Sequence, residues 1–308
     1  SSAQVYAVHE SWSVPKRAFY STDCGSLTLA PSIPELRKIV HGDDLRLWVS
    51  MPPKPLFEEL DYRETPLGEL ILRRRTILSL ENLEVHEIIL GEAFLMSSMF
   101  TAVEIALSHL GLAPVETHYP GEAQLDVIVG GLGLGYTAQA ALEHSSVRSL
   151  VVVDYLKPVI EWHEQGLVPL GAELMADSRC QLVHADFFER ALASPDEPGF
   201  YPEKPNQMFH AILLDIDHSP NNLLHERHDT FYHPDGLRKL AAKIHPGGIF
   251  ALWSDDAPDE AFMSALHEVF ATCESHVVTF HNPLQDRKSA STVYVAQLPF
   301  PAAYKLQR

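Results

Sequence analysis

Cysteine is scarce in this sequence. The 308 residues contain three cysteines, Cys24, Cys180 and Cys273, which lie far apart and include no C-x-x-C pair. A chain held together by disulfides or by a cysteine zinc site has more cysteines at shorter spacings. Both are therefore disfavoured, and a reducing, cytoplasmic location is expected.

Basic residues and long apolar runs are also few. Lysine and arginine number 23 against 41 acidic residues, which gives a formal net charge of −18. Nucleic-acid binders present a basic face, so no nucleic-acid partner is expected; the acidity suits either plain solubility or a cationic substrate. No apolar run approaches the roughly 20 residues that span a bilayer, and no basic segment precedes a hydrophobic one at the N-terminus. Neither a membrane span nor a signal peptide is expected.

The first of three regions, residues 1–58, is an N-terminal extension to which the sequence assigns no role. Its patterns predict a strand at 27–30, a short helix at 34–40 and a strand at 45–49. The proline-rich stretch 51–55 is typical of a linker.

The second region, residues 59–112, is predicted to be a β-hairpin element with a connecting helix. Thr65-Pro-Leu-Gly68 is typical of a hairpin turn, and 69–80 is the clearest strand sequence. That strand contains the basic run Arg73-Arg-Arg75, for which a solvated strand edge is favoured over an anion site. Apolar residues at helical spacing predict a helix over 94–112.

The third region, residues 113–308, alternates strands and helices as in a parallel α/β sheet. Strands are predicted at 125–129, 150–153, 181–184, 209–214, 249–253, 276–280 and 291–297. Helices are predicted through 138–142, from Pro158, over 237–243 and over 259–272. With 46% hydrophobic residues the chain can bury a full core. The fold class is therefore α/β: a Rossmann-like sheet beside a small N-terminal β-rich element.

The strongest chemical signal is Gly130-Gly-Leu-Gly-Leu-Gly135, which lies between a predicted strand and a predicted helix. Glycines such as Gly131, Gly133 and Gly135 let the backbone turn tightly and approach a nucleotide at the helix N-terminus. A tight strand–helix turn with no ligand would also need glycine.

Three successive strands end in an acid: Asp154, Asp186 and Asp215. Open α/β sheets bind ligands at this edge, where Asp154 suits ribose hydroxyls and Asp186 an adenine amino group. Each aspartate alone could be a helix N-cap, but together they favour a nucleotide site. The loop is not a strict G-x-G-x-x-G, and a Pro246-Gly-Gly248 turn precedes the fifth strand, so a mononucleoside is favoured over a dinucleotide.

From about residue 61 to 298 the chain resembles the spermidine synthase branch of the class I methyltransferase-like fold. The motifs that carry the resemblance are Val85-His-Glu87, Gly130–Gly135, Val153-Asp154, Ala185-Asp-Phe-Phe188, Leu213–Pro220 and His245-Pro-Gly-Gly248. The resemblance implies decarboxylated S-adenosylmethionine, or S-adenosylmethionine itself, as co-substrate and a small-molecule amine as acceptor. It also implies that Asp215 accepts the proton of the attacking amine, that no metal is needed and that a homodimer forms.

The sequence departs from the family pattern at two motifs. The family loop usually reads G-G-G-D-G, whereas the present loop has no acid. After the fourth strand the family usually reads D-[ST]-[ST]-D-P, whereas this chain has Asp215-Ile-Asp-His-Ser-Pro220. The second acid is thus displaced to Asp217, and His218 stands in its place.

Further candidates surround Asp215. Asp217 is expected to assist it, while Asp255 and Asp256 either hold a distal ammonium or begin the next helix as cap and acidic first turn. His218, together with Glu87 from the N-terminal element, is expected to contact substrate. Trp162, Tyr232 and Trp253 are expected to pack. The histidines at 218, 225, 228 and 233 indicate a polar lid rather than a metal site, because their spacings match no standard site.

Three functions stay open from the sequence. The leading one is aminopropyl transfer to an amine, the second is methylation of a small molecule, and the third is nucleotide binding without catalysis. The acid at each strand end favours the two transferases over the binding protein.

Overall fold

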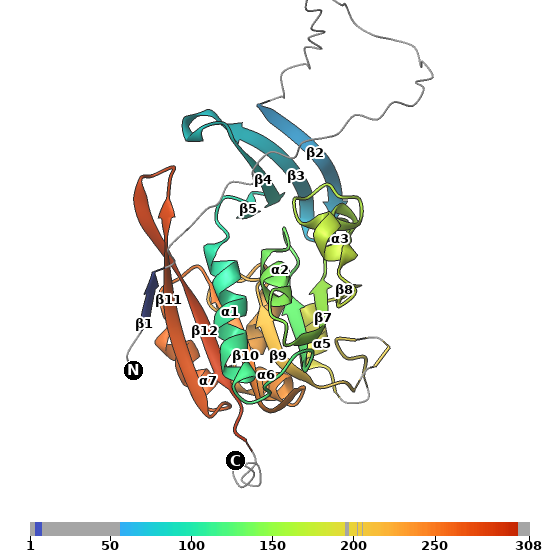
Figure 1. The fold of residues 1–308 in the computed structure, drawn as a ribbon, viewed down its shortest axis with the longest axis vertical. Coiled ribbons are helices and arrows are strands. Elements are labelled where there is room, and N and C mark those ends of the chain that lie inside the picture. Colours follow the sequence, from blue (N-terminus) through green and yellow to red (C-terminus); the bar gives the residue numbers. More distant parts are fainter. Residues whose placement is uncertain (1–3, 8–55, 195–196, 202, 205, 301–308) are drawn as a thin grey trace, which may run out of the picture.

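The computed structural model describes residues 4–7, 56–194, 197–201, 203–204 and 206–300 (Figure 1). The elements expected at 27–30, 34–40 and 45–49, and the linker at 51–55, lie outside these residues. No helix in the described part of the chain is long and apolar enough to cross a membrane.

The larger sheet has eight strands in the order β1-β11-β12-β10-β9-β6-β7-β8 (Figure 1). Strands β8, β7, β6, β9 and β10 run parallel, and β12 is antiparallel to both β10 and β11. The strand bounds are β1 Gln4–Ala7, β6 Leu125–Gly130, β7 Val147–Asp154, β8 Cys180–His184, β9 Phe209–Leu214, β10 Ile244–Ser254, β11 Thr272–Asn282 and β12 Arg287–Gln297. The predicted α/β sheet is confirmed, and the antiparallel hairpin of β11 and β12 extends it beyond β10.

Helices cover both faces of this sheet, so its central strands are buried on both sides. Every residue of β6 and β9 is buried, as expected for near-continuous apolar runs in a parallel sheet. One face carries α1 Ala102–Glu116, α2 Tyr136–Leu142, α3 Lys157–Glu164 and α4 Gly171–Ala176. The other carries α5 Phe187–Leu192, the 3₁₀ helix η2 Glu226–Phe231, α6 Pro234–Ala241 and α7 Glu260–His267.

The smaller sheet is antiparallel, in the order β2-β3-β4-β5. Its strands are β2 Phe57–Thr65, β3 Gly68–Ile77, β4 Leu83–Leu90 and β5 Ala93–Ser97, with the short 3₁₀ helix η1 Leu78–Leu80 between β3 and β4. The predicted hairpin is confirmed, since Thr65 pairs with Gly68 across a two-residue turn. Leu72 pairs with Ile88 on the face that packs into the core.

The helix predicted over 94–112 is wrong in its first part. Residues 93–97 form β5, where Phe94 pairs with Ile89 and Met96 with Ile88, and α1 begins only at Ala102. A short apolar run fits either period, and strand pairing with β4 decided this one. Similarly, α7 ends at His267 rather than 272, because Thr272 already pairs with Gln297 in the sheet. Helices α4 and α5 were not predicted.

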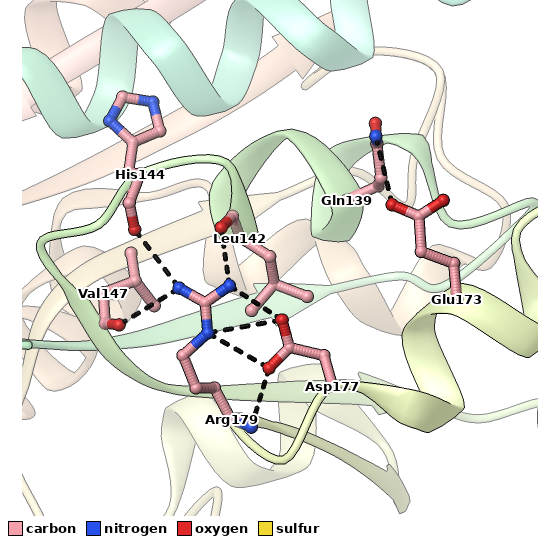
Figure 2. A network of polar contacts seen from close by, with 7 residues as sticks. All are labelled: Gln139, Leu142, His144, Val147, Glu173, Asp177 and Arg179. Carbon is pink, nitrogen blue, oxygen red and sulfur yellow. Dashed lines mark hydrogen bonds and ion pairs between the residues drawn. The ribbon is translucent and has the colours of Figure 1, made fainter.

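Arg179 fastens the end of α2 to the start of β8 (Figure 2). Its guanidinium donates to the carbonyl oxygen of Leu142 at 2.7 Å, and to those of His144 and Val147 at 3.4 Å each. The same group is held by the Asp177 carboxylate, with Nη2 to Oδ2 at 2.7 Å. The fork geometry of arginine therefore satisfies carbonyls that a helix end leaves free.

We expect Arg179→Lys to lower the free energy of unfolding by about 1–2 kcal/mol, because a lysine ammonium cannot reproduce the fork. Urea unfolding of the variant and the unaltered protein measures the difference. Arg190→Lys is the matched control, since the one side-chain bond of Arg190 among the described residues is an exposed one, to the carbonyl of Pro198. Equal loss in both variants would contradict a special role for Arg179.

Candidate active site

A cavity of about 140 Å³ lies between the carboxyl edge of the large sheet and the inner face of the small one. The small sheet and its hairpin turn contribute an apolar wall, made of Leu67, Ile88, Leu90, Leu95 and Met96. The large domain contributes the polar side, which includes Glu104, Tyr136, Thr137, Asp154, Asp186, Asp215, His218, Arg227, His228 and Trp253. One wall of the cavity is therefore apolar, and the opposite side carries four carboxyl groups.

The glycine loop forms part of the cavity through Gly131 and Gly133. Gly131 has φ of 95°, and a Cβ there would collide with the carbonyl oxygen of Asp215. At Gly133 a Cβ would collide with the sulfur of Met96, which therefore fills the space beside the loop. Gly135 does not line the cavity; it is the N-cap of α2, with φ of 94°.

Asp154 lies at the end of β7 and lines the cavity. Its carboxylate accepts the backbone N–H of Leu132 at 2.8 Å and that of Leu156 at 2.7 Å. Burial raises the pKa of this carboxyl group. Asp154 therefore fixes the glycine loop against β7, and each oxygen keeps a lone pair that a ribose hydroxyl can use.

Asp186 combines two of the roles that its sequence position suggested. One carboxylate oxygen caps α5, accepting the backbone N–H of Phe188 at 2.9 Å and of Glu189 at 3.1 Å. The other lies 2.7 Å from the guanidinium of Arg227, which stands over the Tyr155 ring at 5.2 Å. Asp186 also lines the cavity, so the cap and the cavity wall are the same residue. Arg227 was not predicted.

Asp215 follows β9 directly and lies beside a second carboxyl group, Glu104. Thr137 donates its hydroxyl to Asp215 at 2.7 Å, yet burial raises the pKa of Asp215 to about 6. Burial, and then the charge of Asp215, raises the pKa of Glu104 to about 8. Two buried carboxyl groups that repel each other hold a proton near neutral pH, which is typical of acid–base sites.

Glu104 was missed by sequence reasoning. It stands in the first turn of α1, where an acidic residue is common at a helix N-terminus. The signal that could have revealed Glu104 is its position among the apolar residues of α1 that pack on the large sheet.

The structure places Asp217 in the protein interior, which corrects the expectation that it assists Asp215. It is 0% exposed and accepts the N–H of Leu224 at 2.7 Å, the Nδ1 of His228 at 2.9 Å and the hydroxyl of Tyr232 at 2.8 Å. It does not line the cavity. Its three partners come from the segment after β9, so Asp217 anchors that segment.

Glu87 likewise points away from the cavity, so the substrate contact expected of it is corrected. It is 1% exposed on β4, whose Ile88 lines the cavity from the opposite face. Its carboxylate binds Arg73 at 2.7 Å and Arg75 at 2.8 Å. The solvated edge predicted for these arginines is also wrong, because β3 lies between β2 and β4 and its arginines are paired.

Asp255 and Asp256 are exposed just beyond β10, and neither lines the cavity. Asp255 accepts the hydroxyl of Ser291 at 3.2 Å, and its charge contributes to the raised pKa of Glu104. The helix cap is Asp259, which accepts the N–H of Phe262 at 2.6 Å. Asp259, at the end of the acidic stretch, is therefore the cap, whereas Asp255 and Asp256 precede the helix. Asp255 lies close enough to Glu104 for its charge to act.

Two of the three aromatic residues expected to pack also use their polar atoms. The indole of Trp162 is buried and donates to Asp61 at 2.7 Å, which ties α3 to β2. The hydroxyl of Tyr232 binds Asp217, as above. Trp253 lines the cavity, and its buried Nε1 has no hydrogen-bond partner within the described chain.

The segment between β9 and α6 covers one side of the cavity, as a lid would. It contributes His218, Leu224, Arg227 and His228, and His228 stacks on Phe188 at 3.8 Å. His225 caps η2, and His233 lies 3.3 Å from Asp229. Over the described ranges, no group of three or more histidine, cysteine or acidic side chains is arranged to hold a metal ion.

Comparison with known proteins points in one direction. No family model matches the sequence. Over 164 residues it is 29% identical to polyamine aminopropyltransferase 2 of Pseudomonas aeruginosa, covering 50% of this chain and 42% of that protein. Over 149 residues it is 27% identical to the polyamine aminopropyltransferase of Pyrobaculum islandicum, covering 47% and 46%. The chain is similar to the polyamine aminopropyltransferases. It spans less than half the length of these curated relatives.

Solved structures agree with this likeness at the level of fold. Spermidine synthase from Thermotoga maritima superposes with a TM-score of 0.57 at 13% identity, over 79% of this chain and 73% of that one. A spermidine synthase in complex with the transition-state analogue AdoDATO matches with the same TM-score, identity and coverage. The predicted class I methyltransferase-like sheet with an N-terminal β element is thereby confirmed.

Proposed function

We propose that the protein transfers the aminopropyl group of decarboxylated S-adenosylmethionine to a small-molecule amine, with Asp215 as the base. The observation that carries this proposal is the position of Asp215. It lies at the carboxyl end of β9, against the glycine loop, with its pKa raised to about 6. A carboxylate with that pKa is ionised at neutral pH and is a stronger base than an exposed one.

In the proposed reaction the amine nitrogen attacks the propyl carbon bound to sulfur. The new C–N bond forms as the C–S bond breaks, methylthioadenosine leaves as a neutral thioether, and the proton of the amine passes to Asp215. Such an in-line displacement needs positioning above all. The glycine loop and Asp154 would hold the nucleoside, and Asp186 would lie beside its adenine base.

The charge of the cavity supports a cationic donor and a cationic acceptor. Glu104, Asp154, Asp186 and Asp215 line it, whereas the one arginine in its described lining, Arg227, is already paired with Asp186. The apolar wall from the small sheet suits the thioether and excludes water from the reacting carbon.

Titration calorimetry of the purified protein with both nucleotides, followed by assay of methylthioadenosine release with a panel of amines, tests the proposal. We expect tighter binding of the decarboxylated form and release that depends on the amine. Preference for S-adenosylmethionine, with S-adenosylhomocysteine as product, would instead make the protein a methyltransferase. Binding of neither nucleotide would overturn the nucleotide site itself.

A further inference from the structure

The carboxylates that line the cavity differ in what they already bind. Asp154 accepts two backbone N–H groups, Asp186 caps α5 and pairs with Arg227, and Asp215 accepts the hydroxyl of Thr137. Glu104 has no cationic or side-chain partner within the described chain; its contacts are the backbone N–H groups of Val103 and of Glu104 itself. Glu104 and Asp154 thus have backbone partners only, and of the two it is Glu104 that lies beside Asp215.

Helix capping accounts for Glu104 only in part. In a capping box the N-cap side chain accepts the backbone N–H of the third helical residue, whose acidic side chain accepts the N–H of the N-cap residue. Thr101, the N-cap residue of α1, makes no side-chain cap bond, so this reciprocal pair is not formed, although the Glu104 carboxylate accepts backbone N–H groups of the first turn. Moreover, Glu104 is only 9% exposed, and leaving a carboxyl group there carries a desolvation penalty that an exposed cap avoids.

The shape of the cavity indicates which cation Glu104 would meet. The glycine loop bears no acid, and Met96 fills the space beside Gly133. Glu104 lines the same cavity as the loop, where the charge of Asp215 acts on Glu104 and the charge of Glu104 acts on Tyr136. A nucleoside held by the loop with its reacting carbon at Asp215 would therefore share the cavity with Glu104 on the side of its sulfonium substituent.

We propose that Glu104 binds the primary ammonium of the donor's aminopropyl chain and thereby selects the decarboxylated nucleotide over S-adenosylmethionine. This inference rests on the proposed function. S-adenosylmethionine carries a carboxylate at the same end, and Glu104 and Asp215 would repel it with no free cation in the described lining to compensate.

Binding should also depend on pH. The charges and titratable groups that face Glu104 are the carboxylates of Asp215 after β9 and Asp255 after β10, and the phenol of Tyr136 on α2. The pKa of Glu104, about 8 in the empty cavity, leaves it mostly protonated at pH 7. Because the ionised form binds the ammonium, affinity for the donor should rise about tenfold from pH 7 to pH 9 as the proton is lost.

The test compares decarboxylated S-adenosylmethionine with methylthioadenosine, which lacks the aminopropyl group and therefore also the positive charge on sulfur. Glu104→Gln should raise the Kd of the first by about 10- to 100-fold, the range for a lost charged hydrogen bond, and remove its pH dependence. The Kd of methylthioadenosine should change less than about twofold. Glu116→Gln, in the last turn of the same helix and bonded to His144 and Ser146, is the matched control.

Glu104→Asp keeps the charge and should retain preference for the decarboxylated donor, which separates a charge effect from a packing effect. Equal weakening of both ligands in Glu104→Gln, or unchanged affinity for the decarboxylated donor, would overturn the role of Glu104 while leaving aminopropyl transfer intact. If the unaltered protein binds neither ligand, the proposed function fails first and this inference fails with it.

Discussion

Replacing Asp215 by asparagine is expected to lower the rate of methylthioadenosine release by about 10²- to 10⁴-fold, the usual contribution of a general base. An amide cannot accept the proton of the attacking amine, although its oxygen can still accept the hydroxyl of Thr137, which now lies 2.7 Å from the carboxylate. Geometry is thus kept while basicity is lost. Steady-state assay of product release, with the nucleotide affinity measured in parallel, separates the two.

The pH profile gives this prediction its second readout. A carboxylate acts as a base only when ionised, and the pKa of Asp215 is raised to about 6. In the unaltered protein, with the nucleotide saturating, kcat/KM for the amine should therefore fall tenfold per pH unit below about pH 6 and level off above it. Because Asp215 and Glu104 interact, the observed value belongs to the pair. The residual activity of Asp215→Asn should lack this acid limb.

One control variant and two further outcomes make the result decisive. Asp256→Asn changes an exposed carboxylate beyond β10 that does not line the cavity, and it should keep the rate within about twofold. Loss of nucleotide binding in Asp215→Asn would assign Asp215 to structure rather than chemistry. A rate within tenfold of the unaltered protein would remove it from the role of base.

The placement of Asp154, Asp186 and Asp215 could be predicted because each follows an apolar strand directly. Parallel strands bring their carboxyl ends to one edge, so strand pattern alone brings these three carboxylates together. Glu87 needed one more fact, namely which face of β4 meets the large domain. The alternation of β4 puts Ile88 in the cavity and Glu87 on the far face, with Arg73.

The contacts of Asp217 and Glu104 could not be predicted from the sequence pattern. Asp217 stands two residues after Asp215, yet the chain has left the strand there and turns inward. Its partners His228 and Tyr232 lie 11 and 15 residues further on, and no periodicity links them. Glu104 is brought beside Asp215 by the packing of α1 on the sheet, across more than 100 residues of chain. Contacts of this kind depend on tertiary packing rather than on local sequence.

Asp217→Ala is expected to lower the free energy of unfolding by about 3–5 kcal/mol, because it leaves several buried donors without an acceptor. These are the N–H of Leu224, the Nδ1 of His228 and the hydroxyl of Tyr232. Asp217→Asn keeps the shape and one acceptor oxygen, so its loss should be smaller. Urea unfolding at equilibrium measures both variants.

Asp229→Ala is the matched control, because its carboxylate is 65% exposed in the same segment and contacts only His233 within the described chain. Its unfolding free energy should change by less than about 0.5 kcal/mol. The anchored segment also supplies Leu224, Arg227 and His228 to the cavity, so Asp217→Ala should weaken nucleotide binding as well as stability. If Asp217→Asn were instead fully stable but as inactive as Asp215→Asn, Asp217 would be a chemical group after all, as its sequence position suggested. Stability and turnover measured on the same two variants therefore separate an anchor from a second base.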